Sequence, residues 1–496
     1  MDISILSVAQ HKGNARVWLQ GNVLLRAGFE PSTPYQVRAE RGSIVISKIK
    51  EPPIEAESAH PTEISDGIRI RKVACKRKNE KSIPIIDLNN AEMSEVLKGL
   101  ERVRAVYKTN QIRLLPLASD IRIKERLDRA KFRVSNGEAL KVGSLAHGGG
   151  ILSHALHKGL NEVGIKTKLS FSNEIREDLT NHAMEANSIW DADTLSLNGP
   201  MQEFAFDSWV MDALGSDLDV LEAGLPCSGA SLAGLARLKL EHPEAHPHVG
   251  HMVVPFLAII GKTNPSVIVL ENVKNYLKTA SMCLIRNQLQ DWGYVLYETI
   301  IRGEDWNALE HRERMVLVAV TQGMQFSFVG MSKPSRKERR LGEILEDVAI
   351  DSSTWSMMEG LKNKQERDLL AQKGFKMQIF DANSAYIATL TKGMAKNRST
   401  DPKIRHPFDA DLLRVPTVIE HVRAKGFPEE LVAGLCYTTG HELAGQSVNY
   451  GPIVSIGEMV GYAYKDLQAA TFAEPDTLLT QAVHEKAVRC QKRTFH

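Results

Sequence analysis

Single residues that could take part in a chemical reaction follow several apolar segments of this 496-residue chain. Cys227 follows the segment LDVLEAGL, with Pro226 before it and small residues after it. A deprotonated cysteine on a strand-end loop can act as a nucleophile, although most single cysteines are small buried hydrophobic groups. The chain has five cysteines with no CxxC and no close pair, which argues against a disulfide framework and a zinc site. Chemistry at Cys227 would therefore use one thiol alone.

A carboxylate and two arginines occupy similar places further along the chain. Glu271 follows the aliphatic run VIVL in PSVIVLENVKN, where burial would raise its pKa and let it hold a proton. A helix N-cap or a surface salt bridge is the alternative. Arg312 and Arg314 in EHRERMVLVAV lie on one side of a predicted strand, where they could hold an anion or a base carbonyl. An ordinary charge cluster at a strand edge is the alternative for this pair.

A glycine-rich turn and an acidic residue indicate a cofactor site. LKVGSLAHGGG is an apolar strand that runs into a turn containing Gly148 and Gly150, and Glu174 ends the next predicted strand, TKLSFSNE. Backbone N–H groups of such a turn can cradle a cofactor, and a carboxylate at the next strand end can accept hydrogen bonds from a ribose. Because the full GxGxxG pattern is absent, a tight connection and a lone surface glutamate remain open as alternatives.

These residues need a scaffold that brings strand ends together, and the chain from about residue 140 predicts one. Predicted strands and amphipathic helices alternate there, which is the pattern of a doubly wound, mostly parallel sheet of the α/β class. In such a sheet, ligands bind beyond the carboxyl ends of the strands. Every candidate residue named above is predicted to lie at such an end.

The N-terminal part is predicted to be a duplicated β-rich extension. The order strand, helix, hairpin occurs at residues 12–50 and again at 83–117. Residues 1–135 carry 25 Lys and Arg against 16 Asp and Glu, so we expect a polyanion partner, although a solvated basic surface would explain the charge equally well. Each copy resembles the swapped-hairpin modules of bacterial DNA-binding proteins related to AbrB, on the basis of Gly28, Phe29 and Gly42.

Residues 321–410 lose the alternating pattern and are basic and polar, which is typical of an inserted surface-reading domain. The predicted organisation has six parts: a β-rich module at 1–50, a linker at 51–67, a second β-rich module at 68–135, a core at 136–321, an insert at 322–411, and the end of the core with a closing helix at 412–496.

The order of the motifs matches one family. The glycine turn, SNE, AGLPC, PSVIVLENVKN, HRERMVLVAV, the basic insert and GQSVNYGPIVSIGEMVG follow one another between Leu140 and Gly461. This series resembles the DNA (cytosine-5) methyltransferases over about two-thirds of the chain. The resemblance implies a Rossmann-like methyltransferase core, an inserted target-recognition domain, and S-adenosyl-L-methionine as the cofactor.

The resemblance also implies roles for individual residues. Cys227 would add to carbon 6 of cytosine, Glu271 would stabilise protonation of ring nitrogen 3, and Arg312 and Arg314 would surround the base. The target base would have to leave the duplex, because a stacked base exposes neither atom. Asp193 is placed near the adenine amino group, with Asp191 as its rival. The implied cofactor-binding residues are Leu145, Gly148, Gly150, Glu174, Asp193, Pro226, Gly445, Ser447 and Val448.

Several positions depart from the family's pattern, and we expect them to alter cofactor packing and the loop that closes on DNA. Ser144 stands in place of an Asp and Glu310 in place of a Gln. The other departures are Ala146, Ile151, Ser228, Ala230 and Gln446.

The predicted function is methylation of cytosine carbon 5 in duplex DNA at a specific sequence, in the manner of bacterial or phage restriction-modification systems. One alternative is cytosine-5 methylation of tRNA, and another is a catalytically silent DNA-binding regulator with the same fold. We expect no metal ion. We also expect no membrane association, because no apolar run is long enough to span a bilayer. The expected location is the cytoplasm, in association with the nucleoid, and the N-terminal modules are expected to add DNA affinity or to dimerise.

Overall fold

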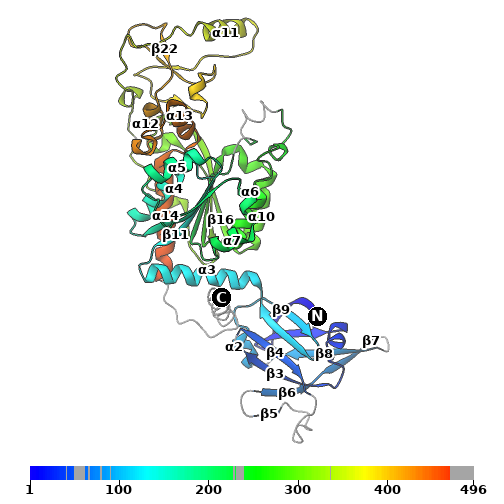
Figure 1. The fold of residues 1–496 in the computed structure, drawn as a ribbon. Helices are drawn as coiled ribbons and strands as arrows, with labels where there is room; N and C mark the ends of the chain where they lie inside the picture. Colours follow the sequence, from blue (N-terminus) through cyan, green and yellow to red (C-terminus); the bar gives the residue numbers. More distant parts are fainter. Residues whose placement is uncertain are drawn as a thin grey trace. The chain divides into compact units, whose positions relative to one another are not determined.

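The computed structural model describes residues 1–40, 42–49, 62–64, 68–78, 81–89, 91–226, 229–230, 239–335 and 337–469. The chain divides into two compact units (Figure 1). We call them the N-terminal unit, which ends at Glu125, and the C-terminal unit, which begins at Arg126.

Ten strands form one sheet in the N-terminal unit, in the order β5-β6-β3-β4-β10-β9-β1-β2-β8-β7. Its elements are β1 (Asp2–His11), β2 (Asn14–Gln20), α1 (Asn22–Arg26), β3 (Pro34–Glu40), β4 (Ser43–Lys48), β5 (Thr62–Ile64), β6 (Ile68–Lys72), β7 (Ala74–Lys78), β8 (Lys81–Leu88), α2 (Ala91–Val96), β9 (Arg102–Lys108) and β10 (Gln111–Pro116).

The two sequence repeats are interleaved in this sheet. The order β2-α1-β3-β4 recurs as β8-α2-β9-β10, as the repeat predicts. Strand β2 pairs with β8, and β4 pairs with β10, so each copy supplies neighbours to the other. One hydrophobic cluster includes Val17 and Ile46 from the first copy together with Ile86 and Ile112 from the second. Residues 1–125 therefore form one unit rather than two separate modules, because neither copy encloses a core alone.

Helix α3 (Ala118–Ser135) joins the two units, in a segment that we expected to be β-rich. Its second half belongs to the C-terminal unit. The Arg126 guanidinium donates to the Trp292 carbonyl at 2.6 Å and lies 3.9 Å from the Tyr294 ring centroid. Arg133 pairs with the buried Asp219 at 2.7 Å. These bonds place the start of the C-terminal unit near residue 126, ten residues before the predicted limit at 136.

The C-terminal unit contains the predicted doubly wound sheet, with strand order β13-β12-β11-β14-β15-β18-β16. The five strands from β13 to β15 in this order are parallel, and β18 is antiparallel to both of its neighbours. Its elements up to residue 321 are β11 (Leu140–Leu145), α4 (Ile151–Glu162), β12 (Thr167–Glu174), α5 (Glu177–Ala186), β13 (Leu195–Asn198), α6 (Met201–Phe204), α7 (Ser208–Leu214), β14 (Val220–Ala223), α9 (Val253–Thr263), β15 (Val267–Val273), α10 (Ala280–Asp291), β16 (Tyr294–Arg302), β17 (Glu310–His311) and β18 (Glu313–Thr321).

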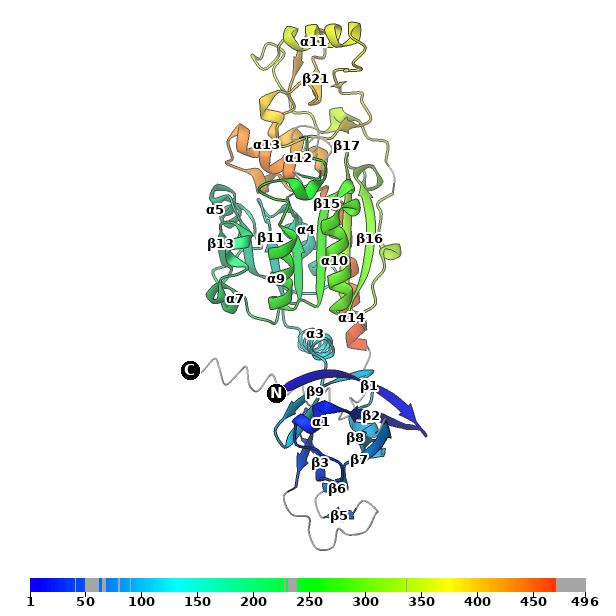
Figure 2. The same cartoon turned by 90° about the vertical axis from the view of Figure 1, so that its right-hand side faces the viewer.

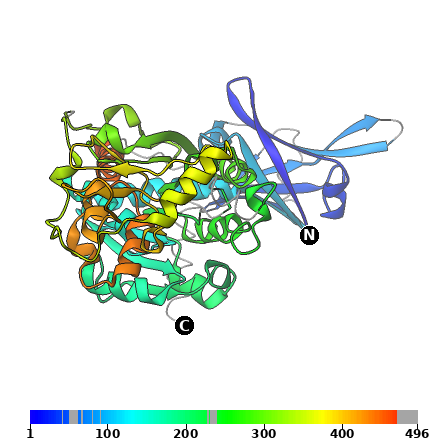
Figure 3. The same cartoon turned by 90° about the horizontal axis from the view of Figure 1, so that it is seen from above.

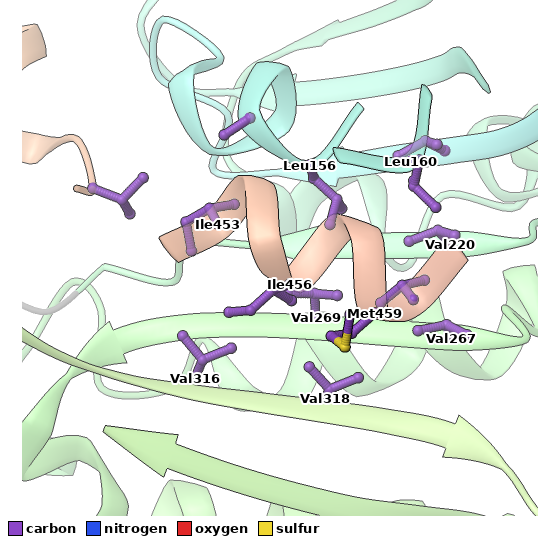
Figure 4. Packing of buried hydrophobic residues seen from close by; sticks show 14 of the residues in the cluster. Leu156, Leu160, Val220, Val267, Val269, Val316, Val318, Ile453, Ile456 and Met459 are labelled. Carbon is purple, nitrogen blue, oxygen red and sulfur yellow. The ribbon is translucent and has the colours of Figure 1, made fainter. Parts of the chain in front are cut away.

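Helices cover both faces of this sheet, because successive residues of each buried strand point to opposite faces. On one face, Val220, Val267 and Val316 pack against α4 and α14 (Tyr450–Ala469), as Figure 4 shows. On the other face, Leu221 and Ile268 pack against α9 and α10, which lie in front of the sheet in Figure 2. The prediction of an α/β class fold is confirmed.

The insert has its own small core, which includes Leu341, Ile387 and Ile404. The predicted limits differ slightly from this packing: Met324 and Phe326 pack into the main core, and Leu413 pairs with Arg405 within the insert's three-stranded sheet. In Figure 3, which looks onto this region, α11 is yellow and α12 and α13 are orange. The helices and strands of the insert and of the segment that follows it are α11 (Glu359–Leu370), β19 (Ile379–Phe380), β20 (Ile387–Ala388), β21 (Lys403–Arg405), β22 (Leu413–Arg414), α12 (Val418–Lys425) and α13 (Tyr437–Gln446).

Short 3-10 helices complete the described elements: Pro243–Ala245, Lys274–Lys278, Gly303–Trp306, Phe328–Gly330, Leu341–Glu343, Met394–Lys396 and Glu429–Val432. Among the residues that the structure describes, no helix is both long enough and apolar enough to cross a membrane.

Candidate active site

The carboxyl ends of the parallel strands gather most of the predicted residues at one edge of the sheet. Leu145, Glu174, Asn198 and Ala223 end strands β11 to β14, and Glu271 lies near the end of β15. This edge is where a doubly wound sheet binds its ligands. Cys227 and Ser228 lie outside the described residues, so the predicted nucleophile is placed only by its neighbour Pro226 in the sequence.

Glu174 is held against the glycine turn. The Gly148 backbone N–H donates to Oε2 of Glu174 at 2.7 Å, and the Arg176 N–H donates to Oε1 at 3.0 Å. Both contacts fix the carboxylate while leaving further lone pairs on its oxygens for hydroxyl donors. Gly148 has a φ of 58°, and a side chain added there would meet no atom within 4 Å. An acceptor beside open space at a glycine turn fits the ribose of a nucleoside cofactor.

His147 stabilises the same turn through two side-chain contacts. Its Nδ1 lies 2.6 Å from Ser144 Oγ, and its Nε2 accepts from Trp190 Nε1 at 3.3 Å. Burial lowers the pKa of His147 to about 3, so the ring is neutral at physiological pH. Since Nε2 accepts, Nδ1 carries the proton and donates to Ser144. Neither His147 nor Trp190 was among the residues predicted from the sequence, although the departures at positions 144 and 146 marked this turn as unusual.

Ser144 faces a buried carboxyl group on the neighbouring strand. Glu222 is its register partner on β14 and is 1% exposed. Burial raises the pKa of Glu222 to about 7, although the nearby Ser144 and Ser153 hydroxyl groups oppose the shift. The family resemblance places an Asp at position 144. In this chain the residue there is Ser144, and Glu222 on the neighbouring strand provides a carboxyl group beside it. No signal within the motif series pointed to Glu222.

Asp193 does not lie at this edge. Its carboxylate pairs with Lys168 at 2.8 Å and is 80% exposed, and Asp191 lies 3.8 Å from the same lysine. Lys168 is near the start of β12, about 20 Å along the strand from Glu174. Neither aspartate is brought to the carboxyl edge of the sheet, because both precede β13 instead of following it. Asn198 ends that strand, and the next residue, Gly199, donates its N–H to the Glu174 carbonyl at 2.9 Å.

Leu145 and Pro226 contribute to the edge in different ways. The Leu145 side chain is fully buried in the core, so the backbone alone borders the turn, and its carbonyl accepts from the Gly224 N–H at 3.2 Å. Pro226 lines a pocket together with Leu225 and Tyr276. The Asn272 amide donates to the Leu225 carbonyl at 3.1 Å, which ties the Pro-Cys loop to the strand that carries Glu271.

Glu271 is buried next to a guanidinium group. It is 8% exposed, and its Oε1 lies 3.1 Å from Arg314 Nε. Burial raises its pKa above the ordinary value, although Arg314, Arg312 and Lys425 each lower it. A carboxyl group whose pKa is raised in this way can hold a proton and pass it to an acceptor.

Arg312 lies in the gap between β17 and β18, and Arg314 lies on β18 itself. The Arg312 side chain is 4% exposed, and its Nη2 donates to the Gly445 carbonyl at 3.2 Å. Arg314 thus reaches Glu271, and Arg312 reaches Gly445 in the closing motif, GQSVNYG at residues 445–451, from two positions that one residue separates. The result is a buried cluster of one protonatable acid and two cations beside the Pro-Cys loop.

The closing motif returns to the glycine turn. Gly445 lies at the end of α13, and a side chain added there would meet the Lys392 backbone nitrogen at 2.1 Å. Ser447 Oγ donates to the Leu443 carbonyl at 2.7 Å, and Val448 is buried in the main core. Leu443 packs so closely on Gly149 that a side chain there would collide with it. These contacts bring residues 443–448 next to the turn at 148–150.

Among the described residues, no group of His, Cys, Asp and Glu side chains could hold a metal ion. The groups that this edge offers for chemistry are the protonatable Glu271, the two arginines, and the loop that leads from Pro226 to the predicted nucleophile.

Comparison with known proteins relates this edge to a family. Residues 140–461 match the model of the C-5 cytosine-specific DNA methylases. The chain is 28% identical over 259 residues to type II methyltransferase M.SsoII of Shigella sonnei, which covers 49% of the chain and 64% of that protein. It is 28% identical over 250 residues to type II methyltransferase M.NlaX of Neisseria lactamica, covering 49% of the chain and 76% of that protein. The chain thus spans just under two-thirds of M.SsoII.

The fold is similar to a solved structure, the Dnmt2 methyltransferase of S. pombe. The TM-score is 0.51 at 17% identity, and the match covers 66% of this chain and 99% of the other. At this identity the likeness supports the fold of the C-terminal unit.

Proposed function

The chain belongs to the family of C-5 cytosine-specific DNA methylases, and from this premise we propose that it methylates carbon 5 of cytosine in duplex DNA at a specific sequence. The observation that carries the proposal is the protonatable Glu271, buried against Arg314 on a strand that Asn272 ties to the Pro-Cys loop. S-adenosyl-L-methionine, when bound, supplies the electrophilic methyl group.

The residues of the chain perform the remaining steps of the proposed mechanism. The Cys227 thiolate adds to carbon 6 of the flipped cytosine, while Glu271 delivers its proton toward ring nitrogen 3. This addition makes carbon 5 nucleophilic, so that it can accept the methyl group. Loss of the proton from carbon 5 then restores the double bond and expels Cys227 as the thiolate. Arg312 and Arg314 stabilise the electron density that moves into the ring.

The cofactor is proposed to lie along the glycine turn. Gly148 provides open backbone, Gly150 lets the turn pack closely against His147 and Asn187, and Glu174 accepts hydrogen bonds from the ribose hydroxyls. Gly445, Ser447 and Val448 close the pocket from α13. Asn198 replaces Asp193 as the residue that we assign to the adenine side, because it ends β13 at the correct edge.

A covalent trap tests the reaction. Duplex DNA with 5-fluorocytosine in the methylated sequence cannot release fluorine from carbon 5, so a covalent complex should accumulate when cofactor is present. Cys227→Ala should abolish the complex, and bisulfite sequencing of DNA from expressing cells should locate the site. Trapping on tRNA but not on duplex DNA would contradict the proposed substrate. Absence of trapping on both, with DNA binding retained, would indicate a silent regulator.

For the N-terminal unit we propose a contact with DNA outside the methylated sequence. Lys76 and Arg77 are exposed on the edge strand β7, Lys72 is exposed at the end of β6, and all three offer charge to phosphates. Deletion of residues 1–135 should weaken DNA binding and flatten its salt dependence. A fragment of residues 118–496 keeps the half of α3 that packs on the C-terminal unit and is the better-folded comparison. An unchanged salt slope together with a lost dimer would favour dimerisation instead.

A further inference from the structure

Glu310 and Lys425 form a buried ion pair directly behind Arg312. The Lys425 Nζ lies 2.6 Å from Glu310 Oε2, and both side chains are 0% exposed. Glu310 occupies the position at which the family resemblance places a neutral Gln. Burying a charged group costs free energy unless a partner compensates it, so an isolated Glu at this position would be strongly unfavourable.

The Glu310 carboxylate joins separate elements around the catalytic arginine. Its Oε1 accepts from the Leu390 N–H at 2.8 Å and lies 3.6 Å from Arg312 Nη1. With its side-chain amide oriented to satisfy both of its atoms, Asn449 donates to Oε2 at 3.3 Å. One carboxylate thus connects Leu390 of the insert, the last residue of α12, the residue before α14 and the strand that leads to Arg312.

The two terminal nitrogens of the Arg312 guanidinium contact different groups. Its Nη2 donates to the Gly445 carbonyl at 3.2 Å, and Glu310 contacts its Nη1. The guanidinium is therefore held by a carbonyl of the closing motif and by the Glu310 carboxylate. A shift of that carboxylate would move Arg312 relative to Glu271 and the base.

Burial and the neighbouring charges both act on the pKa values of the pair. Burial alone would raise the pKa of Glu310, yet Lys425 and Arg312 hold it below its ordinary value. Burial and Arg312 lower the pKa of Lys425, while Glu310 raises it. The pair adds no net charge beside the base. The other titratable groups near the Glu310–Lys425 pair are Arg314, Glu271 and two histidines, His421 and His441. Burial lowers the pKa values of the two histidines.

We propose that Glu310 and Lys425 act together as a positioning pair that sets the orientation of Arg312 toward the flipped cytosine. The pair positions Arg312, and Glu310 stands where the family resemblance places a neutral Gln. The pair also connects Arg312 to Leu390 of the insert. This inference rests on the proposed function, since it concerns the same base-binding arginine.

Two single substitutions and their combination test the pair in the full-length enzyme. In Lys425→Met, Arg312 becomes the sole remaining cation against Glu310 and is drawn toward it, so kcat should fall by roughly 100-fold. In Glu310→Gln, the amide still accepts from Leu390, and Lys425 can lose its proton, so the fall should be smaller. The double variant restores a neutral Gln with no buried charge, and it should recover most of the lost kcat.

The pH profile separates positioning from packing. In Glu310→Gln, protonated Lys425 repels Arg312 at low pH, whereas neutral Lys425 at higher pH does not. The kcat deficit relative to wild type should therefore shrink as pH rises. The KM values for DNA and for cofactor should stay near those of the wild type in all three variants.

Arg414→Met provides a matched control at the other end of α12. Arg414 pairs with Glu420 at 2.6 Å, and these side chains are 3% and 2% exposed, so the cost of breaking the pair is comparable. This variant should lose thermal stability but keep kcat. A double variant no better than Lys425→Met, or an equal loss of kcat in Arg414→Met, would overturn the proposal. Failure of the wild type to trap 5-fluorocytosine would instead contradict the proposed function.

Discussion

The cores of the two units differ in the groups that they bury. In the described part of the N-terminal unit, the buried polar side chains are the hydroxyl groups of Thr33 and Ser43. The C-terminal unit instead buries Glu222, Glu271 and Glu310 at or behind one edge of its sheet. Buried charge lowers stability unless it is compensated. The comparison predicts that substitutions in the N-terminal core act on folding, whereas substitutions of the buried carboxyl groups at the edge of the C-terminal sheet act on chemistry.

Substitution of Glu271 should give the largest effect, with a loss of kcat and little change in stability. Glu271→Gln removes the proton donor, so kcat should fall by about 10²- to 10⁴-fold. The melting temperature should change little, because the amide resembles the protonated acid that burial favours. Steady-state methylation and differential scanning fluorimetry measure the two effects. Glu298→Gln, on the partly exposed pair with Arg286, is the control. Retained kcat in Glu271→Gln would show that burial of charge does not mark the active site.

An apolar substitution in the N-terminal core should show the opposite pattern. Ile112 is 0% exposed in a cluster built from both repeats. Ile112→Ala should lower the free energy of unfolding of the N-terminal unit by about 2–5 kcal/mol through loss of contacts and a residual cavity. Urea unfolding monitored by hydrogen exchange resolves this unit from the other.

The control for that substitution lies on the same sheet. Ile5 is 59% exposed on β1, so Ile5→Ala should have a much smaller effect. At saturating DNA, kcat should be unchanged in both variants. A fall in kcat for Ile112→Ala alone would mean that the N-terminal core also serves the reaction.

Glu222 should give a smaller effect that depends on pH. Its pKa is about 7 in the folded chain, above the value of 4.5 of a free glutamate. The folded state thus keeps a proton that the unfolded state releases, so stability falls as pH rises between these values. Glu222→Gln should remove this fall and raise stability at pH 8 by about 2 kcal/mol. Urea unfolding at pH 5 and pH 8 tests it, and parallel curves for wild type and variant would contradict it.

The smallest effect is expected at Asp193. Its carboxylate is exposed and pairs with Lys168 at the amino end of β12. Asp193→Asn should leave the dissociation constant of S-adenosyl-L-methionine unchanged in isothermal titration, whereas Asn198→Ala should weaken it. A weaker cofactor affinity in Asp193→Asn would restore the role that the sequence indicated.

Much of the structure of this protein follows from local sequence pattern. Alternation of apolar residues predicted the strands of both units, and the order of short motifs predicted the family and the edge at which Glu174, Glu271 and the arginines meet. These inferences succeed because strand and helix periodicity, and the place of a residue at a strand end, depend on neighbours in the chain. Asp193 instead lies before β13 and pairs with Lys168 near the start of β12, away from that edge.

Tertiary structure alone decided which distant residues meet. The interleaving of the two N-terminal repeats, the approach of Glu222 to Ser144, and the pairing of Glu310 with Lys425 join positions separated by tens of residues or more. No local pattern encodes such partners, because the free energy of burying a charge depends on what the rest of the fold brings beside it. The sequence by itself determined where the reactive groups stand on their strands, and the fold determined their protonation and orientation.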